Sequence, residues 1–247
     1  MSRSKIIRAE DFQAPLGLAS PLDIPGAFLW LDAANIGAGI DADPVNLDPV
    51  TTWRDKSGNS HDFVAIGTGA DRPTFLSTGL AGQPTVQIDG TQHGLRAAPG
   101  FSKPNGPVTC AFVGQQTGGT FYNIDVLADA RFLYWLNNPA QGNWYFRDAF
   151  LGSPGVAESS ILYSVAVFDE DRVPTAELRV NGTSIRSDAG YTNHSWNDTT
   201  TVGSRYTGEA LNNWAGFMSE WILYDFALSQ AQIAQLEGYF ATKWGII

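Results

Sequence analysis

Aromatic side chains crowd two neighbouring segments in the middle of the chain, a composition typical of sugar-binding surfaces. Tyr134 and Trp135 stand in the run 131–136, and Trp144 and Arg147 follow in the run 144–147 after an Asn- and Pro-containing linker. This linker predicts a hairpin, and strand alternation then places Tyr134 and Trp135 on opposite faces. An exposed ring can stack on a sugar while polar groups bond its hydroxyls.

A second polar and aromatic segment lies further along the chain. It contains Tyr191, His194 and Trp196, followed by Asn197 and Asp198. The segment offers the same mixture of stacking and hydrogen-bonding groups, so it is a second candidate for carbohydrate binding. Aromatic residues on strands more often pack in a core. Packing is therefore the alternative for every ring in both segments.

Carboxylate oxygens cluster in one loop, where Asp41, Asp43 and Asp48 stand close together in the sequence. Such oxygens are the ligands that Ca²⁺ prefers. Asp55 and Asn59 form a second oxygen-rich candidate for this cation. Neither segment has the helix–loop–helix setting of an EF-hand, and solvated turns are the alternative. We expect no other cofactor.

The sequence contains no local arrangement of residues for bond cleavage, so we expect a protein that is not an enzyme. Glycosidases need two neighbouring carboxyls, which jelly-roll glucanases supply from one strand as Glu-x-Asp-x-x-Glu, a run that is missing here. The densest acidic stretch, 169–171, follows a predicted strand and indicates a solvated loop. His61, His93 and His194 show no paired metal spacing, and neither Gly-x-Ser-x-Gly nor a P-loop occurs.

Short apolar runs separated by turn residues predict the strands that would position these groups. Residues 85–90 alternate, and 161–168 form a nearly continuous apolar run, as expected for a central strand covered on both faces. Residues 176–180 alternate and run into Asn181-Gly182, the strongest short hairpin signal. Because βαβ alternation is missing, the pattern predicts an all-β, two-sheet antiparallel jelly-roll sandwich.

One short helix is predicted near the C-terminus. Ser229 and Gln232 match a capping box, and Ile233, Leu236 and Phe240 form an apolar stripe at helical spacing. About twelve residues make a marginal helix in isolation. We therefore expect this helix to dock on the sandwich.

Composition limits the class of protein. The 247 residues are 43% hydrophobic and carry a formal net charge of −10, which favours one large core and opposes binding to nucleic acid or anionic membranes. The lone cysteine, Cys110, stands in an apolar run and is expected to be a buried, inert thiol. We find no secretory signal peptide and no run of eighteen apolar residues, so we expect no membrane insertion.

The first 25 residues differ from the rest of the chain. Pro15, Pro21 and Pro25 oppose a helix, and the segment predicts an extended N-terminal arm that either lies on the domain or reaches a partner. The expected organisation is thus an arm over 1–25, which could anchor the chain in an assembly, and one jelly-roll domain over 26–247.

Several segments match one family in order and spacing. They are Leu29-Trp30-Leu31-Asp32-Ala33, Trp53-Arg54-Asp55-Lys56-Ser57-Gly58-Asn59, Ile88-Asp89-Gly90, Gly216 to Tyr224, and Tyr239 to Gly245. In these residues the chain resembles the laminin-G-like, or concanavalin A-like, jelly-roll domains common in bacterial and phage surface proteins. Most of the matched residues also have a structural explanation: Asp55 and Ser57 can bond backbone amides in their loop, and Glu220 is expected to hold a loop or pair with an Arg.

This resemblance implies a non-enzymatic virion surface protein, such as a bacteriophage head or tail decoration, fibre or spike, that recognises host glycans. Its partners would be host-surface polysaccharide and, through the arm, other virion proteins. A homo-oligomer made in the host cytoplasm is expected. A purely structural decoration protein without sugar binding is the first alternative, and a glycan-cleaving enzyme is the second.

Overall fold

The computed structural model describes residues 18–91, 94–102, 105–119, 124–127, 134–135, 144–146, 149–152, 161–188, 190, 192, 199–203 and 214–246. For the strands between 124 and 152 it describes the backbone. Over these ranges the chain is an antiparallel β-sandwich with one C-terminal helix, which confirms the predicted fold class.

The main sheet has eight strands in the order β14-β13-β12-β7-β16-β5-β4, and β1 also pairs with β16. Every pairing in it is antiparallel. Its strands are β1 (Ala27–Asp32), β4 (Thr74–Leu80), β5 (Gln83–Asp89), β7 (Val108–Gly119), β12 (Leu162–Phe168), β13 (Ala176–Val180), β14 (Thr183–Asp188) and β16 (Trp214–Tyr224).

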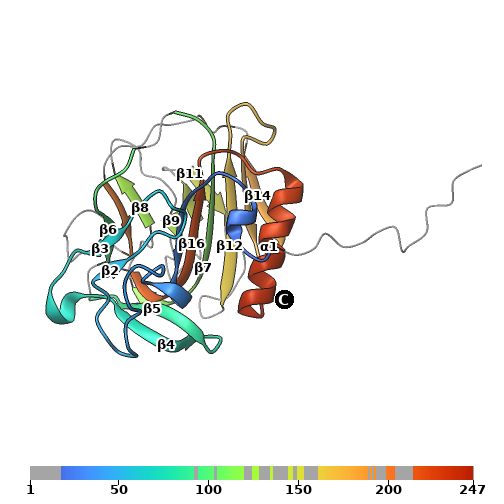
Figure 1. Ribbon diagram of the computed structural model, residues 1–247. Helices are drawn as coiled ribbons and strands as arrows, with labels where there is room; N and C mark the ends of the chain where they lie inside the picture. The colour runs from blue at the N-terminus through green and yellow to red at the C-terminus, as the bar shows by residue number, and fades with distance from the viewer. Residues whose placement is uncertain are drawn as a thin grey trace, which may run out of the picture.

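A five-stranded sheet lies against one face of the main sheet, and the terminal helix covers the other (Figure 1). The five strands, in spatial order, are β2 (Thr52–Trp53), β3 (Phe63–Ala65), β6 (Leu95–Ala97), β15 (Thr199–Val202) and β8 (Ile124–Leu127). A third, three-stranded sheet contains β11 (Ala149–Gly152), β10 (Trp144–Phe146) and β9 (Tyr134–Trp135).

The central strands are apolar on both faces because both faces are covered. In β7, Cys110 and Phe112 belong to the core between the sheets, whereas Ala111 and Val113 belong to the cluster under the helix. Every residue of β12 is buried in the same alternating way. The predictions of a central strand over 161–168 and of a buried Cys110 are therefore confirmed.

Helix α1 (Gln230–Trp244) begins and docks as its sequence predicts. Ser229 caps it through the expected box with Gln232, and Gly245 ends it at a left-handed φ of 63°. Its stripe residues are buried in the cluster on the outer face of the main sheet. Within the described residues, no helix has the length and apolar character needed to cross a membrane.

The last residues of the predicted arm lie on the domain. A short 3-10 helix, η2 (Pro21–Asp23), precedes β1, and the Pro21 carbonyl accepts a hydrogen bond from the Tyr224 hydroxyl at 3.0 Å. Ile24 is buried in the cluster beneath α1. Residues 1–17 lie outside the described residues, and the division into an arm and a domain at residue 25 stays a prediction.

Candidate functional site

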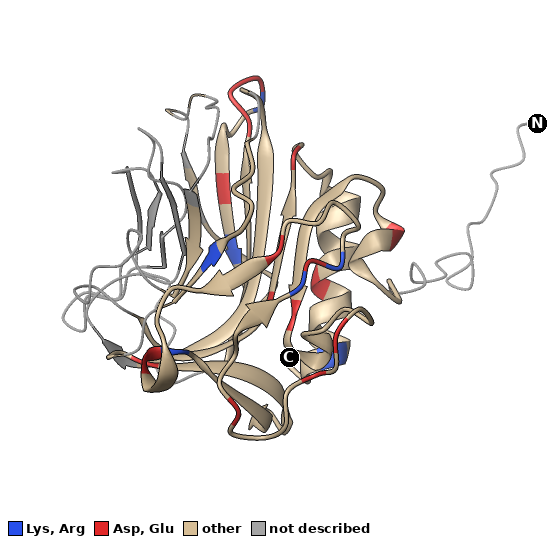
Figure 2. Ribbon diagram, turned by 60° about the vertical axis from the view of Figure 1, so that its left-hand side comes forward, with Lys and Arg blue, Asp and Glu red and all other residues tan. Residues whose placement is uncertain are grey.

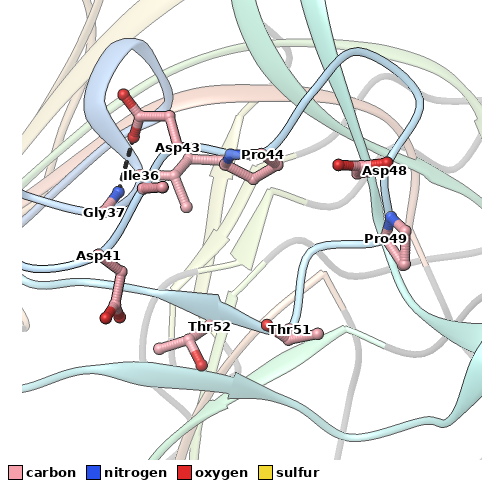
Figure 3. Close-up of a pocket in the computed structure, with 10 residues that line it drawn as sticks. Ile36, Gly37, Asp41, Asp43, Pro44, Asp48, Pro49, Thr51 and Thr52 are labelled. Carbon is pink, nitrogen blue, oxygen red and sulfur yellow. Dashed lines mark hydrogen bonds between the residues drawn. The ribbon is translucent and has the colours of Figure 1, made fainter.

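An open pocket of about 430 Å³ lies in the connection between η3 (Ala33–Asn35) and β2. Its lining consists of Ile36, Gly37, Asp41, Ala42, Asp43, Pro44, Asp48, Pro49, Thr51 and Thr52. We call it the Asp pocket. In Figure 3 the Asp43 carboxylate turns back to the Gly37 amide, while Asp41 and Asp48 lie on different sides of the open loop. The predicted cluster of Asp41, Asp43 and Asp48 therefore shares one cavity.

Short-range hydrogen bonds fold the connection into this shape. Asp43 Oδ1 accepts from the Gly37 amide at 2.8 Å, and Asp48 Oδ2 accepts from the Val45 amide at 2.9 Å. Such side-chain to backbone bonds are the usual reason that Asp occurs in tight turns. The second turn is also bonded to β4, since the Phe75 amide donates to the Asp48 carbonyl at 2.9 Å.

The pocket carboxylates retain acceptor capacity for a ligand. Asp41 binds the Arg54 guanidinium through Oδ2 at 2.6 Å, while Asp43 and Asp48 each use one oxygen for a backbone amide. Among the described residues, none donates to the second oxygen of these three carboxylates. An ionised carboxylate accepts hydrogen bonds through both of its oxygens. The cavity can thus receive a ligand that presents several hydroxyl donors.

Arg54 stands at the edge of the Asp pocket and is shared by two carboxylates. Its Nη1 lies 2.6 Å from Asp62 and its Nη2 lies 2.6 Å from Asp41. The hydrogen bonds that Arg54 donates to Asp62 and Asp41 raise the pKa of its guanidinium above the usual value. Arg54 is therefore a fixed positive charge that holds Asp41 in place.

In the described part of the chain, no group of three or more His, Cys, Asp or Glu side chains is arranged to hold a metal ion such as calcium. Asp55 instead accepts hydrogen bonds from the amides of Trp30, Ser57 and His61. Asn59 donates to the carbonyl of Phe28 at 3.0 Å. The pair considered for calcium therefore fastens its loop to β1, as expected from the structural explanation for Asp55.

The ring-rich hairpin is present in the backbone. Strands β9 and β10 pair antiparallel, with Trp135 opposite Trp144 and Tyr134 opposite Tyr145. The side chains of these residues lie outside the description, and so do Arg147, Tyr191, His194 and Trp196 entirely. The carbohydrate-binding roles assigned to these seven predicted residues remain predictions.

The sequence reasoning missed a second cluster of charges, beneath α1. Glu220 on β16 is 0% exposed and accepts four hydrogen bonds from donors on β1 and α1. The donors are Trp30 Nε1 at 2.7 Å, Tyr239 Oη at 2.7 Å, Lys243 Nζ at 3.1 Å and Trp244 Nε1 at 2.9 Å. Four donors use all the lone pairs of a carboxylate. Glu220 is thus saturated by the protein itself and joins the helix to the sheet.

Asp32 completes this cluster from the neighbouring strand. It lies directly opposite Glu220 in the β1–β16 register, and Lys243 bonds to both carboxylates. Lys56 also bonds to Asp32, at 2.8 Å, and its ammonium lies 3.9 Å above the ring of Trp30. Two carboxylates are therefore balanced by two lysines.

Burial and charge act against each other on these groups. Burial alone would raise the pKa of Asp32, but the ammonium groups of Lys243 and Lys56 outweigh it and lower that pKa. Burial raises the pKa of Glu220, and burial together with the nearby Glu220 raises the pKa of Tyr239. Glu220 was expected to hold a loop or to pair with an Arg; in the structure it pairs with Lys243, one helical turn from Tyr239.

A cavity of about 410 Å³ lies beside this cluster, lined by Leu18, Ala19, Trp30, Asp32, Lys56, Tyr239, Thr242 and Lys243. Its charged groups bond mainly to one another, so it offers a ligand fewer unsatisfied acceptors than the Asp pocket. Acidic residues mark many of the described loops, whereas Lys and Arg are fewer (Figure 2). The Asp pocket is therefore the better candidate site.

Comparisons with known proteins identify a shared fold. No protein-family model and no curated protein sequence matches the chain. Among solved structures, domain 4 of an extracellular arabinanase from Geobacillus stearothermophilus, in complex with arabinotriose, is similar with a TM-score of 0.54 and 16% identity. The match covers 86% of this chain and 99% of that domain.

Two further structures share the fold over part of their length. Trypanosoma rangeli sialidase in complex with sialic acid matches with a TM-score of 0.53 and 13% identity, over 88% of this chain and 33% of the sialidase. The binding domain of Paraclostridial Mosquitocidal Protein 1 matches with a TM-score of 0.55 and 11% identity, over 90% of this chain and 53% of that one. The chain thus spans about a third and about half of these proteins.

These matches correct the prediction that the chain is not an enzyme. The arabinanase and the sialidase show that this sandwich occurs within glycan-cleaving proteins, although the likeness concerns the fold alone. That prediction had searched for residue patterns within single strands and loops, and a likeness at the level of the fold does not depend on such patterns.

Proposed function

We propose that this β-sandwich recognises a glycan and that the Asp pocket contacts its hydroxyl groups. The supporting observation is the match to a complete arabinanase domain solved with arabinotriose, which spans 99% of that domain. The pocket adds an independent argument, since Asp41, Asp43 and Asp48 each keep an oxygen without a protein donor in the described region.

The charge of the pocket narrows the class of sugar. Three Asp side chains line it, and within the described ranges the cation bonded to them is Arg54, which binds Asp41. A cavity of this sign disfavours anionic ligands. Thr51 and Thr52 contribute hydroxyls that can donate or accept. The proposal is therefore a neutral oligosaccharide and not one built from acidic sugars.

A titration with neutral and acidic oligosaccharides, read by calorimetry on the wild-type chain and on Asp43→Asn and Asp48→Asn, tests this proposal. Each substitution keeps the acceptor for its backbone amide and removes the charge. A hydrogen bond to a charged group contributes roughly 1.5–3 kcal/mol, so we expect each variant to bind a neutral oligosaccharide at least about tenfold more weakly.

The matched control is Asp171→Asn, an exposed residue of a loop after β12. It should bind as the wild-type chain does. Equal losses in the control and the pocket variants, or a preference for acidic sugars, would contradict the proposal. The same mixtures are then assayed for new reducing ends, because cleavage would extend recognition to hydrolysis.

Placement on a virion surface is a separate proposal, supported by the resemblance in sequence to domains of phage surface proteins. It includes anchoring through the N-terminal arm, a homo-oligomer, and host polysaccharide as the glycan. Mass spectrometry of purified phage particles, from a host in which the gene lies beside capsid or tail genes, tests it. Absence of the chain from such particles would count against virion placement while leaving glycan recognition intact.

A further inference from the structure

Large apolar side chains are exposed to solvent on the two turns that flank the Asp pocket. Ile40 is 73% exposed, Val45 is 72% exposed and Leu47 is 68% exposed. The described region exposes two other large apolar side chains, Leu22 and Val173, which lie on separate segments. Single exposed apolar residues are normal, whereas larger exposed apolar patches mark interaction sites, and these three on one loop are the densest such group in the described region. We call these three residues the apolar rim.

Leu47 combines an unusual backbone, held by a hydrogen bond from its amide to the Phe75 carbonyl at 2.8 Å, with an exposed side chain. Its backbone has a φ of 73°, a left-handed conformation that Gly or Asn adopts more easily than a leucine. The side chain gains no compensating burial in the domain, because most of it faces solvent. An unfavourable backbone combined with an exposed apolar side chain points to a function for this position.

The charge around the rim selects the kind of partner. Between Ile36 and Trp53 the chain has three Asp residues and no Lys or Arg. A complementary partner would combine apolar side chains with positive charges. The chain itself contains such a segment at residues 3–8, Arg-Ser-Lys-Ile-Ile-Arg, with no acidic residue before Glu10.

We propose that the N-terminal segment 3–8 docks on the apolar rim, with Ile6 and Ile7 against the rim and its basic side chains near the carboxylates of the Asp pocket. The reach of the chain allows this contact. From Ile7 to Leu18 the chain spans up to about 40 Å when extended, whereas a folded domain of this size is about 45 Å across. The segment can therefore reach the rim of a second copy placed beside Leu18.

Paired cysteines in the full-length chain test the docking. Native Cys110 is buried, so new disulfides come from the introduced residues. Under mild oxidation, the double variant Ile6→Cys with Val45→Cys should form its disulfide at least about tenfold faster than Ile6→Cys with Val173→Cys, whose second site is 94% exposed. The size of the product on a non-reducing gel shows whether the rim belongs to the same chain or to a second copy.

Charge reversal at Lys5→Glu and Arg8→Glu should slow the 6–45 disulfide, and high salt should slow it as well, because both weaken the attraction. Equal rates for the 6–45 and 6–173 pairs would overturn the proposal. Insensitivity to both charge reversal and salt would overturn it too. The measurement contains no glycan, so it succeeds or fails independently of the sugar-binding function.

Discussion

Replacement of Glu220 by Gln should destabilise the protein strongly, because this carboxylate joins α1 to the main sheet. The carboxylate accepts two donors on each oxygen: Trp30 and Tyr239 on Oε1, and Lys243 and Trp244 on Oε2. A glutamine has one oxygen, and its NH₂ group would face two donors. Two buried donors therefore lose their acceptor whichever way the amide is turned.

The magnitude follows from those lost partners. Each buried donor left unsatisfied costs about 1–3 kcal/mol, and removing one member of a buried ion pair costs about 3–5 kcal/mol. These estimates overlap because Lys243 belongs to both, so we expect a loss of about 4 kcal/mol in the free energy of unfolding. For a domain of this length that loss corresponds to a Tm lower by roughly 8–16 °C.

Thermal unfolding followed by circular dichroism measures this loss, and urea unfolding checks that the m-value is unchanged. The matched control is Asp171→Asn, an exposed position in a turn, where we expect a change within about 0.5 kcal/mol. If the two variants unfold at the same temperature, the argument that Glu220 holds the helix to the sheet is refuted. A change in the near-ultraviolet tryptophan signal is also expected, because Trp30 and Trp244 both donate to this carboxylate.

Two further predictions concern acid stability and the helix cap. The pKa of Asp32 is lowered when folded, by Lys243 and Lys56, so its stabilising contribution is present above its ordinary pKa of 3.8 and is lost as the pH falls below that value. The slope of unfolding free energy against pH below 3.8 should therefore be shallower in Asp32→Asn than in the wild-type chain, and equal slopes would exclude this coupling. Ser229→Ala removes the cap of α1 and should lower the free energy of unfolding by about 1 kcal/mol. The control Ser77→Ala, at an exposed strand position, should unfold at the same temperature as the wild-type chain. If Ser229→Ala is as stable as this control, the cap does not stabilise the protein.

The parts of the fold that depend on local pattern could be predicted. The alternation of Val86 and Ile88, both fully buried, reports a strand with one face in the core. Asn181 and Gly182 both adopt positive φ in the hairpin between β13 and β14, as their types predict. The capping box of α1 likewise depends on residues three positions apart. In each case the signal and the structure it specifies lie within one short window.

The candidate site was predictable only where it is local. Asp41, Asp43 and Asp48 could be grouped because one loop carries them. The pairing of Asp32 with Glu220 could not, because it depends on the register of two strands at opposite ends of the chain. A weak signal existed in α1, where Tyr239 and Lys243 are spaced to share one helix face. This spacing indicates a shared partner, Glu220, only when the position of the helix on β16 is known.

The position of the chain just before β1 also determines which hydrogen bonds would carry a mechanical force applied at the N-terminus. The Pro21 carbonyl is bonded to Tyr224 on β16, and β1 follows at once and pairs with that same strand over Ala27–Asp32. Tension from a tether would therefore be carried first by the bond to Tyr224 and then by the hydrogen bonds between β1 and β16, the strand whose Glu220 also binds α1.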